Sequence, residues 1–484
     1  MKRILLPLTG AAVALGAFAA PAQAATNDKP LVYIFVVDAL DGDQYDQGRL
    51  PFVKGLVDKR GTYYQESRAI MIAETNPNHT AMITGAYADT SGIPGNDFAL
   101  YGHGAKSVEG CPLDTTGAGP TDAGLAPACV KAQTFFQSTA VKAVRNKVTS
   151  AGIFGKPKLA TLFAAKRSKN KYAADYLWTP CTSTKADYCR KVPTNTFRYA
   201  NDEATMSAVL ASVRDGVKTE NGKRKKANLT FVNLPTVDST GHLHGAGKKY
   251  RKAAASADEQ IKRFVRQQKK LGLWSRTVMF VVSDHSMDTT PQKVSLTEIL
   301  IAAGIPAASF HVVQNGGTDM VYLTDRTSPD RFALLQRMRA AALASASGNG
   351  IDEALYREPN PADGDVTHTL DTVHPAWHLA GERTGDLVVT HLPGGAFTDP
   401  INPMAGGHGG PYTTDNMFAI TGGWRGIAKN GTLTGQTDPR FDDTELNPGQ
   451  AENVDVAPTA LRVLGLEPPR DNQGRVLTEA FAGW

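Results

Sequence analysis

Three apolar runs are the strongest pattern along the chain. Residues 31–37 (LVYIFVV), 229–234 (LTFVNL) and 278–282 (VMFVV) consist almost entirely of aliphatic and aromatic side chains. Such runs are typical of strands buried on both faces, as in the parallel sheet of an α/β protein. An aspartate follows each run within four residues: Asp38, Asp238 and Asp284, respectively.

A long helical pattern lies between the second and third runs. Residues 248–272 are amphipathic, with a polar face rich in lysine and arginine. The alternation of strand, polar cluster and helix predicts an α/β fold with a doubly wound, mostly parallel central sheet flanked by helices. Ligands bind beyond the carboxyl ends of strands in such sheets. We therefore expect the three aspartates to meet at one edge of the sheet.

Other segments have weaker periodicity. Residues 97–147 and 167–200 are rich in glycine, proline, threonine and cysteine, which predicts insertions over the site. Residues 305–400 mix short strands, a helix near 328–345 and loops, which indicates a smaller lobe. We expect one catalytic domain over residues 25–484 that carries these three insertions.

Composition narrows the class of protein. The chain of 484 residues is 41% hydrophobic and 20% charged, which excludes a disordered chain and a coiled coil. Its formal net charge is +5, of which Lys2 and Arg3 supply two charges. This surplus is too small to indicate a nucleic-acid partner.

The N-terminus and the cysteines indicate export. Residues 1–24 have a basic start, a short apolar core and Ala22-Gln23-Ala24 as a cleavage site, which predicts a signal peptide. The mature protein would be secreted or held in the periplasm or cell envelope, without a stable membrane span. An even number of cysteines in an exported chain predicts two disulfides, and Cys111–Cys129 with Cys181–Cys189 is the simplest of three possible pairings.

The candidate chemistry is that of a metal site with a nucleophile. The candidate ligands are carboxylates and imidazoles, which Zn²⁺ takes when no thiolate is offered: Asp38, Asp238, His242, Asp284, His285 and His408. Six ligands would hold two divalent ions, which can act on the attacking and departing oxygens of a phosphoryl transfer. Thr75 lies just before a predicted helix that has Pro77 in its first turn. Backbone N–H groups there favour an anion, and contact with a metal would activate the hydroxyl.

The motifs around Thr75 and the candidate metal ligands resemble those of a known family. Residues 75–80 (TNPNHT), followed by Gly92-Ile93 and Asn96, resemble the nucleophile region of the alkaline phosphatase superfamily, most closely the type I phosphodiesterase/nucleotide pyrophosphatase branch. Residues 238–242 (DSTGH), 283–287 (SDHSM) and 407–409 (GHG) are similar to the metal motifs of that branch, in the same order. The resemblance covers most of residues 30–470.

The resemblance implies roles for individual residues. Asp238, His242 and His408 would hold one zinc ion. Asp38, Asp284 and His285 would hold the other, with Thr75 also in contact with it. Asn96 would donate to a phosphate oxygen during catalysis. His79 and His244 are not assigned as ligands.

Some residues depart from the pattern of this branch. Glu74 and Asn76, on either side of the nucleophile, are unusual there, and residues 75–78 also resemble the phosphonoacetate hydrolases. Lys156 and Lys158 are similar to the substrate-binding lysines of those enzymes, although both could instead be solvated residues that open a helix over 157–166.

The sequence thus predicts an exported two-zinc phosphoester hydrolase with a phosphothreonine intermediate. Its substrate would be a small phosphate ester or nucleotide, as for a phosphodiesterase/nucleotide pyrophosphatase. The alternatives are a phosphonoacetate hydrolase or phosphomonoesterase on the same scaffold, and a metal-containing binding protein without turnover.

Overall fold

The structure is a computed structural model. It describes residues 29–99, 127–141, 148–168, 171–181, 186–218, 222–362, 367–399, 401–434 and 451–484. The predicted signal peptide and Cys111 lie outside these ranges. No helix within them has an apolar stretch long enough to cross a bilayer.

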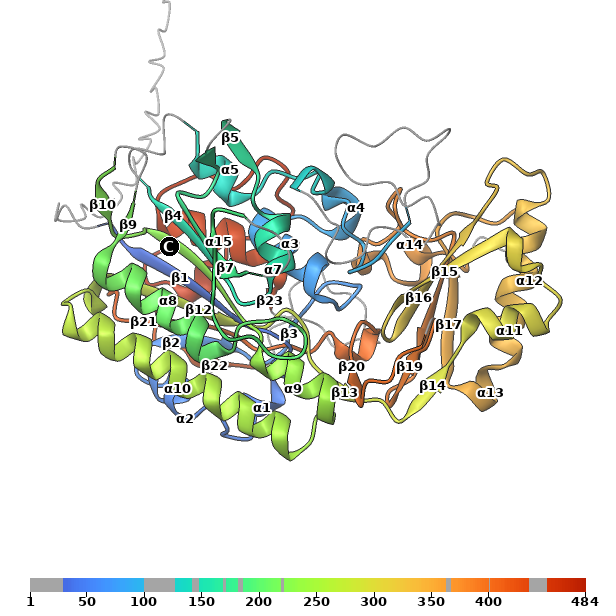
Figure 1. The fold of residues 1–484 in the computed structure, drawn as a ribbon, viewed down its shortest axis with the longest axis horizontal. Coiled ribbons are helices and arrows are strands. Elements are labelled where there is room, and N and C mark those ends of the chain that lie inside the picture. The colour runs from blue at the N-terminus through green and yellow to red at the C-terminus, as the bar shows by residue number, and fades with distance from the viewer. Residues whose placement is uncertain are drawn as a thin grey trace, which may run out of the picture.

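A nine-stranded sheet forms the centre of the protein (Figure 1). The three apolar runs are its central strands, because β1 pairs in parallel with β11 on one side and with β12 on the other. Only β21 runs antiparallel to its neighbours, β12 and β2. The predicted mostly parallel sheet is therefore confirmed. In spatial order the strands are β22 (Gly431–Leu433), β2 (Gly61–Tyr64), β21 (Phe418–Gly422), β12 (Thr277–Val282), β1 (Leu31–Val37), β11 (Leu229–Leu234), β4 (Ser150–Phe154), β7 (Tyr176–Pro180) and β8 (Cys189–Arg190).

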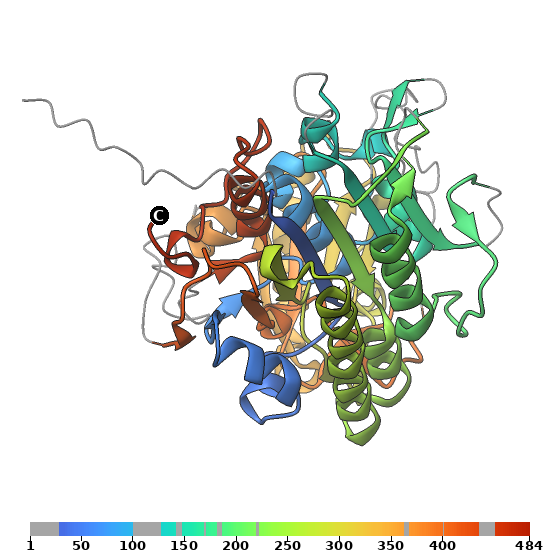
Figure 2. The same cartoon turned by 90° about the vertical axis from the view of Figure 1, so that its left-hand side faces the viewer.

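Helices cover both faces of this sheet, as the end-on view in Figure 2 shows. Val32, Ile34 and Val36 of β1 belong to one core, and the alternating Tyr33 and Phe35 belong to the other. The first core includes α3 (Thr75–Thr84), α5 (Phe135–Thr139), α7 (Pro157–Leu162) and α15 (Val456–Val463). The second includes α2 (Pro51–Val57), α8 (Asp202–Asp215) and α10 (Lys248–Lys270). Burial on both faces explains why the central strands lack alternating polar residues.

A second sheet forms within residues 305–400. It is antiparallel, in the order β15 (Phe310–Asn315), β16 (Thr318–Leu323), β18 (Leu387–His391) and β17 (Ile351–Tyr356). Its core includes residues of α11 (Leu296–Ala302), α12 (Arg331–Ala344) and α13 (Ala346–Asn349). Figure 1 shows this unit in yellow and orange beside the central sheet. The segment 167–200, expected as an insertion, also supplies the last two strands on one side of the central sheet, β7 and β8.

The remaining elements are short connections. The strands are β3 (Ser67–Arg68), β5 (Lys166–Ser168), β6 (Lys171–Tyr172), β9 (Val217–Lys218), β10 (Arg224–Lys225), β13 (Asp288–Thr289), β14 (Gln292–Val294), β19 (Gly395–Phe397), β20 (Gly406–Gly407) and β23 (Ala451–Glu452). The helices are α1 (Asp43–Asp46), α4 (Ala88–Ser91), α9 (Thr236–His244) and α14 (Leu370–Val373).

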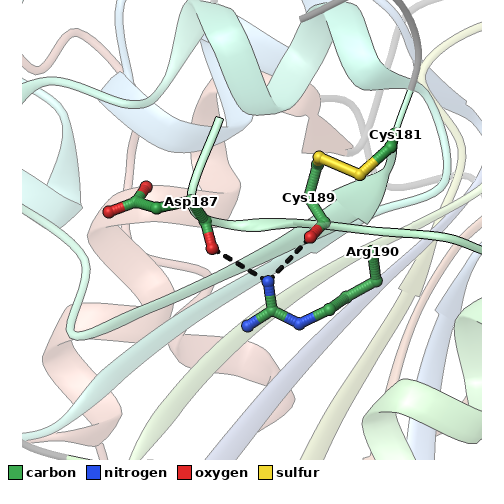
Figure 3. The surroundings of a disulfide bond; sticks show 4 residues. All are labelled: Cys181, Asp187, Cys189 and Arg190. Atoms are coloured by element: carbon green, nitrogen blue, oxygen red, sulfur yellow. Dashed lines mark hydrogen bonds between the residues drawn. A yellow bond between two sulfur atoms is a disulfide. The ribbon is translucent and has the colours of Figure 1, made fainter. Parts of the chain in front are cut away.

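A disulfide joins Cys181 to Cys189, which confirms that half of the predicted pairing. Figure 3 shows the bond beside Arg190, whose Nη1 donates to the backbone oxygens of Asp187 (2.9 Å) and Cys189 (2.7 Å). Cys129 is disulfide-bonded as well, but its predicted partner Cys111 lies outside the described residues. The Cys181–Cys189 bond joins the residue that follows β7 to the first residue of β8.

The smaller unit contains a buried pair of carboxyl groups. Asp399 caps α11, because its carboxylate accepts from the backbone N–H groups of Leu296 (2.6 Å) and Thr297 (3.1 Å). Asp319, on β16, is fully buried. Burial raises the pKa of Asp319 well above its usual value, and the negative charge of Asp399 raises it further. The folded protein therefore retains a proton on Asp319 that the unfolded chain releases.

We expect Asp319→Asn to stabilise the protein increasingly as the pH rises. Above about pH 4 the unfolded chain ionises Asp319, so wild-type stability falls by up to about 1.4 kcal/mol per pH unit until the folded protein also ionises it. Asparagine keeps the neutral form at every pH and removes this cost. Urea unfolding of both proteins at several pH values measures the effect, with the exposed Asp330→Asn as control. A difference in stability that does not change with pH would contradict the raised pKa.

Candidate active site

The carboxyl ends of the three central strands bring the three aspartates together. Asp38 directly follows β1, Asp284 lies two residues beyond the end of β12, and Asp238 lies in the first turn of α9, the helix after β11. All three side chains are buried. The backbone N–H of Ala39 donates to Asp284 Oδ1 (2.9 Å) and so connects the β1 and β12 ends. The structure thus places these aspartates at one edge of the sheet, as the strand pattern led us to expect.

Asp238, His242 and His408 form one group. Asp238 and His242 are four residues apart on α9 and face the same side, with Asp238 Oδ1 3.3 Å from His242 Nε2. His408 follows β20, and its Nε2 lies 3.2 Å from His242 Nε2 and 3.6 Å from Asp238 Oδ1. Three donor atoms therefore converge within the space of one ion.

Asp38, Asp284 and His285 form a second group beside the first. His285 Nε2 lies 3.3 Å from Asp284 Oδ2 and 3.8 Å from Asp38 Oδ1. The rings of His285 and His408 stack with their centroids 3.7 Å apart, so the two groups are in direct contact.

The tautomers of the three histidines suit metal ligation. Nδ1 of His242, His285 and His408 lies 3.2, 2.9 and 3.1 Å, respectively, from a backbone carbonyl oxygen. A carbonyl only accepts, so each Nδ1 carries the proton and each Nε2 presents a lone pair. In the described part of the chain, Asp238 Oδ1, Asp284 Oδ2 and His285 Nε2 are buried without a hydrogen-bond partner. This set of unpaired acceptors fits divalent cations with oxygen and nitrogen ligands.

His79 holds the nucleophile region in place. Its Nδ1 donates to the backbone oxygen of Thr75 (2.9 Å), and its Nε2 accepts from Nδ2 of Asn233 (3.1 Å). Asn233 also donates to Asp38 Oδ2 (2.6 Å). Although His79 Nδ1 lies 3.3 Å from Asp284 Oδ2, both ring nitrogens are already engaged. By contrast, His244 is exposed at the end of α9, where its Nε2 lies 3.3 Å from Lys249 Nζ.

The predicted nucleophile, Thr75, is the first residue of α3 rather than the residue before it. Glu74 is the extended N-cap residue and makes no side-chain cap bond. Pro77 has no N–H and the N–H of Asn78 donates to the backbone oxygen of Glu74 (3.2 Å), so the backbone N–H of Thr75 is the group at this helix start that is available to an anion. Asn96 packs against this helix start, because its Oδ1 accepts from the backbone N–H of Asn76 (2.8 Å). This bond fixes the Asn96 amide and leaves its NH₂ group as the donor toward a ligand.

Lys156 lies between the two groups of ligands. Its Nζ is 2.8 Å from Asp38 Oδ1, 2.8 Å from Asp238 Oδ2 and 2.9 Å from Thr75 Oγ1. Lys156 and Lys158 are both buried, at the N-cap and in the first turn of α7. The alternative interpretation of these lysines as solvated residues is therefore wrong. Helix α7 is also shorter than the predicted 157–166.

The charges at the site are strongly coupled. Burial and the nearby carboxylate of Asp284 raise the pKa of Asp38, although Lys156 opposes the increase. Burial alone would raise the pKa of Asp238, but Lys156 and His242 hold it well below its ordinary value. Burial also lowers the pKa of His408 well below the usual range, and His285 and His242 add to this effect. A neutral His408 beside an ionised Asp238 is the protonation state that a metal requires.

A cavity of about 280 Å³ opens beside the first group. Its lining residues include Glu74, Asn96, Asp97, His242 and His408. Asp97 and Asn233 were not predicted as site residues, because nothing in their local sequence distinguishes them from other loop and strand residues.

The fold and the site together define a metal-dependent phosphoric ester hydrolase of the alkaline phosphatase superfamily. The chain belongs to the type I phosphodiesterase/nucleotide pyrophosphatase family, whose model matches residues 32–411. No curated protein matches the chain. The match to the family model confirms the family that the motifs of residues 75–80 and 238–242 resemble.

Solved structures show the same fold. Murine ectonucleotide pyrophosphatase/phosphodiesterase 5, solved also as an inactive variant in complex with AMP, is 14% identical with a TM-score of 0.64. The human protein of the same name is 13% identical with a TM-score of 0.63. Each match covers 94% of this chain and 100% of the other chain. At this identity the likeness establishes the arrangement of the elements alone.

Proposed function

We propose that the protein is an exported two-zinc phosphodiesterase that acts through a phosphothreonine intermediate. The observation that carries the proposal is the approach of His242 Nε2 to His408 Nε2, at 3.2 Å. Both atoms present lone pairs, which repel each other unless a cation lies between them. The second group, around Asp38, offers the same kinds of donor next to the Thr75 hydroxyl.

Each residue has a defined role in this proposal. Oγ1 of Thr75 attacks phosphorus, a bond from this oxygen to phosphorus forms, and the bond to the leaving alcohol breaks. Water then attacks the phosphothreonine, frees the Thr75 hydroxyl and releases a phosphomonoester. The backbone N–H of Thr75, at the start of α3, and the amide NH₂ of Asn96 donate to the non-bridging oxygens. When bound, the metal ions supply Lewis-acid activation of the hydroxyl and charge neutralisation at the leaving oxygen.

Two further observations support export and the substrate class. The predicted signal peptide over residues 1–24 and the Cys181–Cys189 disulfide are typical of an oxidising compartment. The complex of the murine neighbour with AMP makes a nucleotide diester the first substrate to test.

A panel of three substrates tests the proposal. The mature, zinc-replete protein would be assayed with a nitrophenyl nucleotide diester, a nitrophenyl monoester and phosphonoacetate. We expect the diester to give the highest kcat/KM. A higher value for phosphonoacetate or for the monoester would overturn the diesterase assignment.

The position of Lys156 favours a second candidate, a phosphonoacetate hydrolase or phosphomonoesterase. Its ammonium group lies 2.9 Å from Thr75 Oγ1, where the phosphoryl group of a substrate would also bind. An ammonium group there would pair with the additional negative charge that these two substrates carry and a diester lacks.

The variant Lys156→Met, assayed with the same panel, separates the two candidates. A lost charge-assisted hydrogen bond is worth about 1.5–3 kcal/mol, so kcat/KM should fall about 10- to 100-fold where the lysine contacts substrate. The second candidate predicts that this loss is confined to the monoester and phosphonoacetate. Lys252→Met, on the exposed face of α10, is the control. An equal loss with all three substrates would instead mark Lys156 as a positioning residue.

A further inference from the structure

We infer that Asn315, a residue of the smaller unit, is a positioning residue that holds the Asn96 amide where it donates to the phosphoryl group. This inference deepens the proposed function and rests on it for the role of Asn96. Asn315 is the last residue of β15, next to the two-residue turn of Gly316 and Gly317 that leads into β16. The tip of this hairpin reaches from the smaller unit to the site.

The side chain of Asn315 pairs with the backbone of the residue after Asn96. Its Oδ1 accepts from the N–H of Asp97 (3.3 Å), and its Nδ2 donates to the backbone oxygen of Asp97 (3.1 Å). Asn315 is 1% exposed, so water cannot replace these bonds when they are lost. A carboxamide both accepts and donates, whereas a carboxylate only accepts. An asparagine at this position therefore satisfies both backbone groups of Asp97 at once.

Asn96 is also held by the helix that carries the nucleophile. Its Oδ1 accepts from the backbone N–H of Asn76 (2.8 Å), and its backbone oxygen accepts from Asn76 Nδ2 (3.4 Å). These bonds orient the amide relative to Thr75, the first residue of α3. The bonds from Asn315 fix the backbone that follows Asn96. The NH₂ group of Asn96 is thus aimed before a substrate binds, and donors fixed in advance are the ones that stabilise a transition state well.

The turn next to Asn315 is anchored to the segment that contains His408. The N–H of Gly317 donates to the backbone oxygen of His408 (2.8 Å). Gly316 has a φ of +66°, and a Cβ at this position would overlap the same oxygen, so glycine allows the close approach. One hairpin therefore contacts a candidate ligand of the first group and the backbone beside Asn96, and it fixes these two parts of the site relative to each other.

Gly95 offers a second way to disturb the Asn315 side chain. A Cβ at Gly95 would overlap Oδ1 of Asn315 and would lie 2.8 Å from its Cγ. Relief of this overlap would move Oδ1, which is the atom that accepts from Asp97. Gly95→Ala should therefore act on the same contact as Asn315→Ala, although it leaves the Asn315 amide in the protein.

A double-mutant cycle with Asn96 tests the inference. The wild type, Asn315→Ala, Asn96→Ala and the double variant would be compared by kcat/KM for the nitrophenyl nucleotide diester. Calorimetric titration of the zinc-loaded proteins with inorganic phosphate gives a second readout that needs no turnover, and zinc content is measured for each preparation. Asn360→Ala is the matched control. Asn360 is also 1% exposed in the smaller unit, donates to the backbone oxygen of Phe332 (2.9 Å) and accepts from the N–H of Ala362 (3.0 Å).

We expect Asn315→Ala to lower kcat/KM about 10- to 100-fold, since a small misplacement of a catalytic group has an effect of this size. Asn96→Ala should lower it about 100-fold or more, as for the loss of an oxyanion donor. In the double variant Asn315→Ala should cause no further loss. Phosphate affinity should follow the same pattern, and Gly95→Ala should resemble Asn315→Ala. Zinc content should match the wild type in every variant, and Asn360→Ala should keep wild-type kcat/KM and phosphate affinity.

Multiplication of the two single losses in the double variant would overturn the inference, because Asn315 would then act independently of Asn96. Wild-type kcat/KM in Asn315→Ala, or a loss that follows from depleted zinc, would overturn it as well. If Asn315→Ala does not fold, Gly95→Ala replaces it in the cycle. If the wild type cleaves no ester, the proposed function fails, whereas the phosphate titrations still decide whether Asn315 acts through Asn96. A wild type that neither cleaves an ester nor binds phosphate would contradict both.

Discussion

Thr75→Ala will lower kcat by about 10³-fold or more, in line with the loss of a catalytic nucleophile. The hydroxyl is the only group that the substitution removes from the site, and no other described hydroxyl lies within hydrogen-bond distance of Lys156 Nζ. The bound metal should stay close to the wild-type amount, because three aspartates and three histidines remain. Steady-state kinetics and elemental analysis of the same preparations measure both quantities.

Thr80→Ala is the matched control for this variant. Thr80 lies on α3 as well and is fully buried, but its hydroxyl has no partner among the described residues. We expect its kcat to stay within a few-fold of the wild-type value. Acid quenching during turnover should trap phosphate on Thr75 in the wild type and in Thr80→Ala. Near-wild-type turnover in Thr75→Ala would exclude the nucleophile assignment.

The sequence predicted strands and helices most accurately where their side chains are completely buried. Residues 31–37 form β1 at the predicted bounds, because a strand covered on both faces excludes polar side chains. The long amphipathic pattern over 248–272 likewise forms α10, Lys248–Lys270. The outer strands β7 and β8 were not predicted, because a strand of two to five residues leaves little periodicity to detect.

Prediction of the site depended on a different signal. The order of the metal motifs and their resemblance to a family supplied the six candidate ligands, whereas local pattern alone left each of them ambiguous. Asn233 shows the limit of this approach, and although Lys156 was named through the resemblance to the phosphonoacetate hydrolases, its contact with Asp38 was not predicted. Asn233 binds Asp38 across 195 residues of sequence, and Lys156 binds it across 118. Such contacts arise only when neighbouring parallel strands are assembled, and no local sequence pattern encodes them.

Removal of the metal should abolish activity and also destabilise the fold. Treatment with a chelator is expected to reduce kcat/KM by about 10³-fold or more, since Lewis-acid stabilisation of the transition state is lost. Three buried aspartates, Asp38, Asp238 and Asp284, would then have one ammonium group, Lys156, within ion-pairing distance of two of them. An uncompensated buried charge is costly, and a ligand that binds only the folded state raises its stability. The Tm should therefore fall on chelation and recover when Zn²⁺ is added.

Asp238→Asn separates the two groups of ligands in the same experiment. The substitution weakens the group that contains His242 and His408 and leaves Asp38, Asp284 and His285 intact. We expect the zinc content to fall from two ions to one per chain, with a loss of kcat/KM comparable to that on chelation. Asp330→Asn should retain two ions and full activity. The carboxylate of Asp238 lies 3.3 Å from His242 Nε2 and 3.6 Å from His408 Nε2, so these three residues are expected to bind one of the two ions together. Two zinc ions per chain in Asp238→Asn, or full activity of the chelated wild type, would therefore contradict the assignment.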